Sequence, residues 1–312
     1  MRVGRLVVAG TMLCAASAGA LAQTPSAPPQ PAREDFELGL RFWVSTGETR
    51  RSHDASAFDA SLLNPTSTLT YSNLDGNAAE LFARKRFAER WFVKGNLGFG
   101  VVNTGTFTDQ DFFLVGGRPS MSQTVSAADG RLSYATVDLG REVWQKGIAT
   151  FSLFAGYSQW NERIDGHGFS DSFSSARLPP SVLVISNDLT WKAFRLGGEM
   201  RAVRGRSRFV IEAAVVPYAK YRNEDSHFLR QDPDDLGPVP NVIADGHGWG
   251  AQLEAEWRVG VPQVKGLEFG LGYRYWRMES QSGNQTQAGL TLPVVELRSE
   301  RHGFLLTLSR SW

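Results

Sequence analysis

Hydrophobic and polar residues alternate along most of the chain. Leu38, Leu40, Phe42 and Val44, for example, are separated by single residues that are charged, small or Trp. Because successive side chains of a strand point to opposite faces, this alternation predicts a strand with one apolar face. The same pattern predicts nine further strands, within residues 79–87, 93–101, 134–140, 151–157, 194–202, 209–215, 249–259, 267–275 and 304–312.

The links between these strands alternate in length. Short links lie at residues 88–90, 146–147, 205–206 and 261–263, and long polar links lie near residues 50–66, 104–130, 164–181, 228–246 and 280–293. An even number of strands with short turns at one end and long loops at the other is typical of bacterial outer-membrane barrels. We therefore predict an all-β fold, a ten-stranded antiparallel transmembrane β-barrel with five long extracellular loops and both termini on the periplasmic side.

A soluble β-sandwich is the alternative, but it would need a second sheet over each apolar face. In lipid a single sheet must close, because every strand edge has to be paired. The charged face would then fill a narrow lumen with ion pairs, which argues against a general porin. The residues expected in the lumen are Glu37, Arg41, Glu80, Arg84, Lys94, Arg195, Glu199, Arg201, Glu212, Glu254, Glu256, Glu268 and Arg274.

The segments that include the strands are long for a membrane. A segment of about 20 residues spans roughly 65 Å at about 3.3 Å per residue before tilt, whereas the apolar band of such barrels is about 25 Å tall. We expect the barrel to project well above the membrane.

The N-terminus has the features of a signal peptide. Arg2 and Arg5 precede the apolar residues 6–16, and Ala20-Leu21-Ala22 ends with small residues where a signal peptidase cleaves. We expect residues 1–22 to be the signal peptide, 23–35 a Pro-rich tether, and 36–312 a barrel in the outer membrane of a Gram-negative bacterium, its loops facing the exterior. The one cysteine, Cys14, lies in the removed segment, so the mature chain offers no disulfide, thiolate metal site or Cys nucleophile.

Charge and composition exclude other classes. The chain has 33 Lys and Arg against 32 Asp and Glu, so it lacks the basic surface of a nucleic-acid binder. It has no apolar run of 18 residues, which argues against a helical membrane protein. No Ser-His-Asp arrangement, phosphate loop or nucleotide fingerprint stands in a suitable context, so we expect no cofactor.

Five short motifs resemble one known family. Residues 45–49 (STGET), 108–112 (TDQDF), 154–157 (FAGY), 196–198 (LGG) and 225–227 (DSH) follow one another in the order found in the omptins. Omptins are outer-membrane aspartyl endopeptidases built on a ten-stranded barrel. The resemblance extends over essentially the whole mature chain in strand order and loop length.

The resemblance implies a catalytic site at the extracellular mouth. In omptins an Asp pair in the second loop faces an Asp-His pair in the fourth across a cleft, and the water between them attacks a peptide carbonyl. Carried over by motif, Asp109 and Asp111 hold the water, His227 is the base and Asp225 orients it. The i, i+2 spacing places both members of each pair on one face of an extended segment. A His whose usual pKa is about 6.5 can accept a proton near neutrality.

Other interpretations of these residues stay open. The same Asp and His side chains could hold a metal ion, but no sequence feature selects a metal, and we predict none. Asp165-Gly166-His167 and Asp245-Gly246-His247 repeat one pattern, which we interpret as turn chemistry, with a ligand site as the alternative. A non-catalytic outer-membrane barrel, acting as an adhesin or envelope structural protein, is the second function, and a narrow channel is the third.

The chain departs from the omptin pattern in its substrate pocket. Arg51 and Asn223 stand where the family has acidic residues that accept a basic side chain, so we expect a pocket that prefers neutral or acidic side chains. In the strand over residues 209–215 the odd positions face lipid, so strict alternation would also turn Asp225 and His227 outward. A one-residue bulge near Pro217 or Tyr221 would return them to the cleft.

The expected partners are a polypeptide substrate and outer-membrane lipid. Omptins also bind lipopolysaccharide through outward basic and aromatic residues, and Tyr157 matches one such position. Gln159 and Asn161 depart from the charged pattern that follows it.

Overall fold

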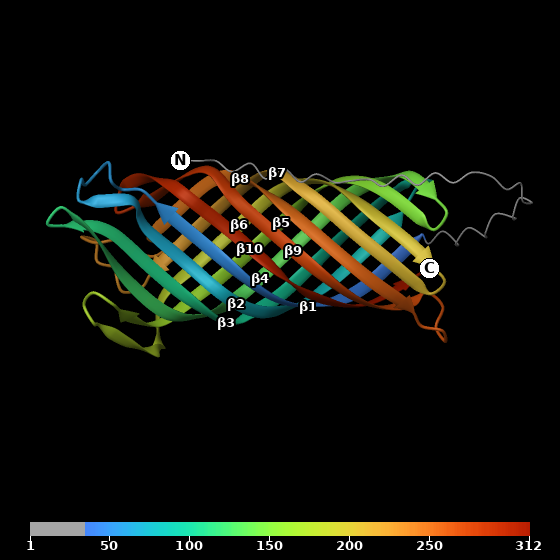
Figure 1. The fold of residues 1–312 in the computed structure, drawn as a ribbon, viewed down its shortest axis with the longest axis horizontal. Helices are drawn as coiled ribbons and strands as arrows, with labels where there is room; N and C mark the ends of the chain where they lie inside the picture. The colour runs from blue at the N-terminus through green and yellow to red at the C-terminus, as the bar shows by residue number, and fades with distance from the viewer. Residues whose placement is uncertain (1–34) are drawn as a thin grey trace, which may run out of the picture. The chain divides into compact units, whose positions relative to one another are not determined.

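The computed structural model describes residues 35–312, so the predicted signal peptide and nearly all of the predicted tether lie outside the described residues. The described chain forms one closed barrel of tilted strands (Figure 1). The strands are β1 (Phe36–His53), β2 (Leu62–Arg86), β3 (Trp91–Val115), β4 (Arg118–Lys146), β5 (Ala149–Asp171), β6 (Arg177–Arg204), β7 (Ser207–His227), β8 (Val242–Gly260), β9 (Leu267–Gln287) and β10 (Leu290–Ser311). Within residues 35–312 there is no helix long and apolar enough to cross a membrane.

Every strand pairs antiparallel with its neighbours in the chain, and β1 pairs with β10 to close the ring. Closure leaves no strand edge unpaired, which is the condition for a sheet that spans lipid. Phe36 at the start of β1 stacks on Trp312 after β10, so the start of β1 and the end of β10 lie at the same end of the barrel. The ten-stranded antiparallel fold predicted from the alternation is confirmed.

The strands are longer, and most links shorter, than the sequence predicts. The short turns lie at residues 87–90, 147–148, 205–206 and 261–266, close to the predicted positions. At the other end, on the left in Figure 1, most of the expected long loops are strand. Residues 104–130 belong mainly to β3 and β4, which join through Gly116 and Gly117, both with positive φ. The longest link of the described chain runs over residues 228–241.

The physical reason is the change of solvent along each strand. Within lipid one face must be apolar, so the alternation is visible in the sequence. Above the membrane both faces can be polar, and the pattern is lost although the backbone ladder continues. The barrel therefore extends beyond the membrane, as expected from the segment lengths.

An apolar belt surrounds the barrel near its short-turn end. Trp249, Leu253, Trp257, Phe269, Leu271, Tyr273 and Leu306, predicted to face lipid, are all 41–58% exposed. Such an area of exposed apolar surface is far larger than soluble monomers tolerate, so this belt contacts membrane lipid. The belt also includes Leu38, Leu40, Phe42, Val44, Leu81, Val93, Leu97, Phe99, Val101, Val137, Leu139, Leu153, Tyr157, Phe194, Leu196, Phe209, Ile211, Val215, Tyr218, Phe304 and Leu308.

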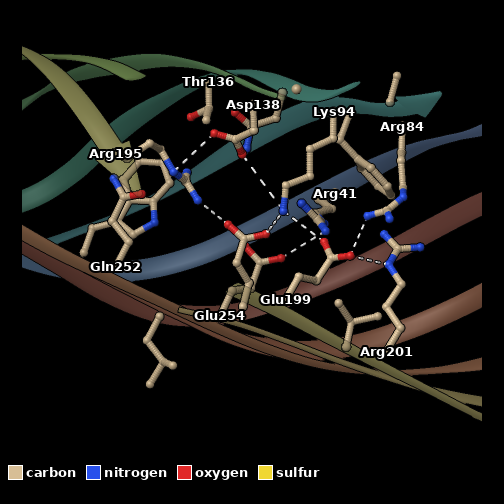
Figure 2. A pocket seen from close by; sticks show the side chains of 18 of the residues that line it. Arg41, Arg84, Lys94, Thr136, Asp138, Arg195, Glu199, Arg201, Gln252 and Glu254 are labelled. Atoms are coloured by element: carbon tan, nitrogen blue, oxygen red, sulfur yellow. Dashed lines mark hydrogen bonds and ion pairs between the residues drawn. The ribbon is translucent and has the colours of Figure 1, made fainter. Parts of the chain in front are cut away.

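Ion pairs fill the lumen at the level of the belt (Figure 2). Glu80 accepts hydrogen bonds from Arg274 at 2.7 Å and from Arg41 at 2.8 Å. Lys94 of β3 reaches Glu199 of β6 at 2.9 Å, across the barrel. All of the charged side chains predicted to face the lumen have an ion-pair partner there, as expected.

An aromatic layer covers this charged network on its extracellular side. Trp43, Tyr134, Trp160 and Trp276 pack with ring centroids 4.9 to 6.3 Å apart. The guanidinium of Arg274 lies 5.0 Å from the Trp276 ring, where the aromatic face attracts a cation. The layer separates the lumen from the extracellular mouth.

Candidate functional site

The two predicted residue pairs lie above the belt, on opposite walls of the mouth. Asp109 and Asp111 lie on β3, where the belt ends at Val101, and Asp225 and His227 end β7. In the ring, β3 and β7 are separated by β4, β5 and β6 on one side and by five strands on the other. The expectation that these residues lie in loops is wrong. Asp109 pairs in the ladder with Leu69 of β2 and Thr124 of β4, so the sheet fixes its backbone.

A bulge in β7 turns Asp225 towards the inside. The pairing of β7 with β8 shifts register between Val216 and Ala219, and Pro217 and Tyr218 are both exposed. Before this point even positions such as Val210 are buried, and after it odd positions are buried. The bulge lies at Pro217, one of the two positions predicted from the sequence. Proline favours such a place because it cannot donate to the ladder.

The Asp pair has few partners. Asp109 is half-buried and accepts a hydrogen bond from the Ser67 hydroxyl at 3.2 Å, while Asp111 is more exposed. No Lys, Arg or His among residues 35–312 lies within ion-pair distance of either carboxylate. Burial, together with the negative charge of Asp111, raises the pKa of Asp109 to about 7. The pair can therefore share a proton near neutral pH.

Asp225 is engaged by an arginine from across the mouth. Its carboxylate is fully buried, forms an ion pair with Arg51 of β1 and accepts a hydrogen bond from the Asn187 side chain of β6. The same guanidinium donates to the Asn223 side-chain oxygen at 2.9 Å. The structure thus brings the side chains of Arg51 and Asn223 into direct contact.

His227 is close to Asp225 without a hydrogen bond between them. Its Nε2 lies 3.9 Å from the nearer Asp225 oxygen, beyond the range of a hydrogen bond. The Asn241 side chain fixes the backbone, accepting from the His227 N–H at 3.0 Å and donating to its carbonyl at 3.2 Å. Burial, with the nearby Arg51 cation, outweighs the Asp225 carboxylate and lowers the pKa of His227 to about 4. The imidazole is therefore neutral at pH 7 and able to accept a proton.

The sequence analysis missed two residues of the mouth. His53 ends β1 and is buried, and burial together with Arg51 lowers its pKa to about 4. Tyr71 of β2 is buried with its ring 4.7 Å from that of Phe107, and burial and the Asp225 charge raise its pKa. The Nδ1 of His53 and the hydroxyl of Tyr71 have no hydrogen-bond partner within the described part of the chain. The i, i+2 spacing from Arg51 could have indicated His53, but no pattern marks Tyr71.

The remaining candidates lie elsewhere. Tyr157 is 45% exposed at the belt, paired across strands with Phe194. The two Asp-Gly-His segments are not turns: they lie in β5 and β8, beside register shifts at His167 and at His247. His247 is exposed and stacks on Tyr218 of the belt. His247 therefore lies on the outer surface of the barrel and not inside the mouth. In the part of the chain that the structure describes, no group of three or more His, Cys, Asp or Glu could hold a metal ion.

Comparisons with known proteins support the fold. No family model and no curated protein matches the sequence. Among solved structures, the chain is similar to the outer membrane protease OmpT from Escherichia coli, with a TM-score of 0.71 and 9% sequence identity over 89% of this chain and 97% of that chain. The translocator domain of the autotransporter NalP from Neisseria meningitidis gives a TM-score of 0.37 at 8% identity, covering 89% of this chain and 88% of that one.

The likeness to OmpT is one of fold, and it agrees with the resemblance to omptins drawn from the motifs. Together with the apolar belt and the closed ring, it identifies the chain as an outer-membrane β-barrel, located in the outer membrane of a Gram-negative bacterium.

Proposed function

We propose that this barrel is an omptin-like outer-membrane endopeptidase, active on polypeptides at its extracellular mouth. The observation that supports this most is the placement of the two motif pairs, Asp109 with Asp111 and Asp225 with His227, on opposite walls above the membrane. The bulge at Pro217 adds to it, because it turns Asp225 towards the inside of the mouth.

The chemistry follows from the protonation states of the mouth. A water held by Asp109 and Asp111 would attack the peptide carbonyl, and the neutral His227 would accept its proton. General-base catalysis of this kind contributes about 10²- to 10⁴-fold. The carboxylate of Asp225 would stabilise the imidazolium that forms, because an opposite charge nearby favours the charged form. No cofactor is needed for this hydrolysis.

The pocket should prefer neutral or acidic substrate side chains. Arg51 lies at the pocket and Asn223 carries no charge, so a Lys or Arg of the substrate would meet a like charge in a buried place. Lipopolysaccharide is a further proposed partner, through Tyr157 at the belt.

Cleavage of a peptide library by refolded protein, with and without lipopolysaccharide, tests the proposal. His227→Ala should reduce kcat/KM by about 10²-fold or more. His247→Ala is the matched control, because it removes an exposed histidine outside the mouth, and it should leave cleavage unchanged. Equal cleavage by the two variants, or efficient cleavage between paired basic residues, would contradict the site or its specificity.

One observation favours the second function, a non-catalytic barrel acting as an adhesin or envelope protein. The ion pair with Arg51 uses the carboxylate that His227 would need. If refolded wild-type protein with lipopolysaccharide cleaves no peptide in a way that depends on His227, this second function is the better one.

A further inference from the structure

Exposed positive charge gathers at the short-turn end of the barrel, on the right in Figure 1. Around the turns and at the end of β10, eight Lys and Arg side chains are exposed, and none has an ion-pair partner within residues 35–312. The exposed acidic residues of this end, in the same described range, are Asp35 and Glu89. This end therefore carries a net positive charge. Its eight cations are Lys85, Arg90, Arg141, Lys146, Arg204, Arg206, Lys265 and Arg310.

The surroundings of this end supply anions of one kind. The short turns of bacterial outer-membrane barrels face the periplasm, and the leaflet on that side consists of phospholipids, whose phosphates lie at the level of the turns. Basic side chains at a membrane surface attract anionic lipids, by about fivefold in affinity for each side chain. At the extracellular end, by contrast, exposed arginines such as Arg222 and Arg230 have acidic partners in the chain. The cations of the short-turn end are thus available to lipid phosphates.

Arg141 is the cation whose position defines a site. It faces lipid from β4, between the exposed side chains of Leu139 and Val143. Its guanidinium carbon lies 5.5 Å from the centre of the Trp91 ring on β3, which helps to hold it in place. A cation beside lipid needs an anion close by, because an apolar environment penalises a lone charge. Arg is suited to a phosphate, since a guanidinium can donate two parallel hydrogen bonds to it.

A groove in the apolar belt begins at Arg141. It has a volume of about 760 Å³, and sites that hold small molecules measure about 300–1,000 Å³. Its walls come from β3, β4, β5 and β6, and it extends from Arg141 to Phe194. Ala155 forms its floor, since its cross-strand neighbours Leu139 and Leu196 have longer side chains. The lining is mostly apolar and faces lipid, so the occupant that fits is a hydrocarbon chain.

We infer that Arg141 and this groove form a binding site for an anionic phospholipid of the periplasmic leaflet. One acyl chain lies in the groove, and the phosphate accepts hydrogen bonds from the Arg141 guanidinium. Tyr157, proposed above to contact lipopolysaccharide, lines the other end of the groove, whereas Arg141 lies at its periplasmic end. The inference needs only the barrel and its location, so it holds whether or not the barrel cleaves peptides.

Titration of the refolded chain in neutral detergent micelles with dioleoylphosphatidylglycerol, followed by native mass spectrometry, tests the site. We expect one tightly bound phosphatidylglycerol per barrel. Dioleoylphosphatidylcholine has the same chains without the net charge and should bind at least fivefold more weakly. Glycerol phosphate, which has the phosphate without the chains, should not bind.

Arg141→Gln should weaken the binding of phosphatidylglycerol about fivefold, the usual effect of one basic side chain at an anionic membrane surface. Arg310→Gln is the matched control. Arg310 is also exposed at the short-turn end and lies 5.2 Å from the ring of Trp312, but it belongs to β10 and does not line the groove. This control should bind phosphatidylglycerol as tightly as the wild type.

The groove is tested separately, by a variant that keeps Arg141. Ala155→Phe places a ring on the floor of the groove and should weaken the binding of phosphatidylglycerol at least fivefold. Ala255→Phe makes the same change at another exposed position of the belt, on β8, and should leave binding unchanged. Equal binding by these two variants would show that no acyl chain occupies the groove and would overturn the inference.

Three further results would also overturn it. Equal affinity for phosphatidylcholine and phosphatidylglycerol, or equal losses in Arg141→Gln and Arg310→Gln, would indicate a non-specific lipid contact. Arg141→Gln that weakens lipopolysaccharide binding as much as phosphatidylglycerol binding would assign Arg141 to lipopolysaccharide. A wild type that is dimeric in lipid-free micelles and becomes monomeric on Arg141→Gln would assign the groove to a second copy of the chain.

Discussion

The lumen and the mouth of this barrel both bury charged groups, but they satisfy them differently. In the lumen Glu80 has two arginine partners within 2.8 Å, and Glu199 pairs with Arg84, Lys94 and Arg201. In the mouth Asp109 has a single hydroxyl at 3.2 Å. Glu80 and Glu199 each have two or more cationic partners, whereas burial and the charge of Asp111 raise the pKa of Asp109 to about 7, outweighing the Ser67 hydroxyl and the Arg51 charge.

This difference distinguishes charged groups that stabilise the fold from charged groups that can take part in catalysis. Densely paired groups hold the barrel closed and cannot change their protonation without a large loss of stability. Sparsely paired groups can gain or lose a proton near neutral pH, which is what catalysis requires. The ion pair of Asp225 with Arg51 brings lumen-like pairing into the mouth.

The largest effect is expected in the lumen. Glu80→Ala removes one of the two anions that Arg41 and Arg274 share, the other being Glu254, and breaking a buried pair costs about 3–5 kcal/mol. Urea unfolding followed by Trp fluorescence measures the loss. Glu296→Ala is the control, since its ion pair with Arg50 is largely exposed and contributes at most about 1 kcal/mol. Equal losses would show that the lumen pairs do not stabilise the barrel.

Asp225→Asn should give an intermediate effect. The amide keeps the shape but removes the charge that holds Arg51, and a hydrogen bond to a charged group contributes about 1.5–3 kcal/mol. We expect a loss of that size in urea unfolding. Peptide turnover should fall while substrate affinity stays nearly unchanged, because the proposed task of Asp225 is to stabilise the protonated His227. A variant as stable as the wild type would exclude mouth pairing as a structural element.

The pH dependence should follow the Asp pair and not the histidine. Since the pKa of His227 is about 4, it is already neutral where Asp109, with a pKa of about 7, still ionises. The rising limb of kcat/KM should therefore lie near pH 7. Asp111→Asn removes a negative charge beside Asp109, lowers the pKa of Asp109 and should move this limb to lower pH. A limb that stays in place would assign it to another group.

The raised pKa of Asp109 also predicts how the stability of the barrel changes with pH. An unfolded Asp has a pKa of about 3.9, and the folded value of Asp109 is higher. Its contribution to stability is therefore fully present below about pH 4 and is lost as the pH rises through about 7. Asp109→Asn should remove this pH dependence from urea unfolding curves measured between these values.

The smallest perturbation tests the boundary between lipid and water. Leu253→Cys, in the belt, should be protected from a water-soluble thiol reagent in membranes, and Ser174→Cys, in the link between β5 and β6, should react. Because the predicted mature chain has no cysteine of its own, each label reports one position. Equal labelling at both positions would contradict the membrane-spanning barrel.

The sequence predicted the barrel where lipid and lumen impose opposite demands on the two faces of a strand. Alternation located the belt residues, the even strand number, the charged lumen and the bulge at Pro217. It could not predict the strand ends above the membrane, because polar residues on both faces remove the pattern. The motif residues were therefore assigned to loops although they lie on β3 and β7.

The sequence by itself determined which side chains of a strand face lipid and which face the lumen, because that depends on odd or even position along a single strand. Only the tertiary structure decided their partners in the mouth. Arg51 and Asp225 are 174 positions apart, and they meet because closure of the ring brings the ends of β1 and β7 within reach of one long side chain. Neither residue carries a local signal of the other, so the contact that fills the pocket follows from barrel closure and not from any pattern along the chain.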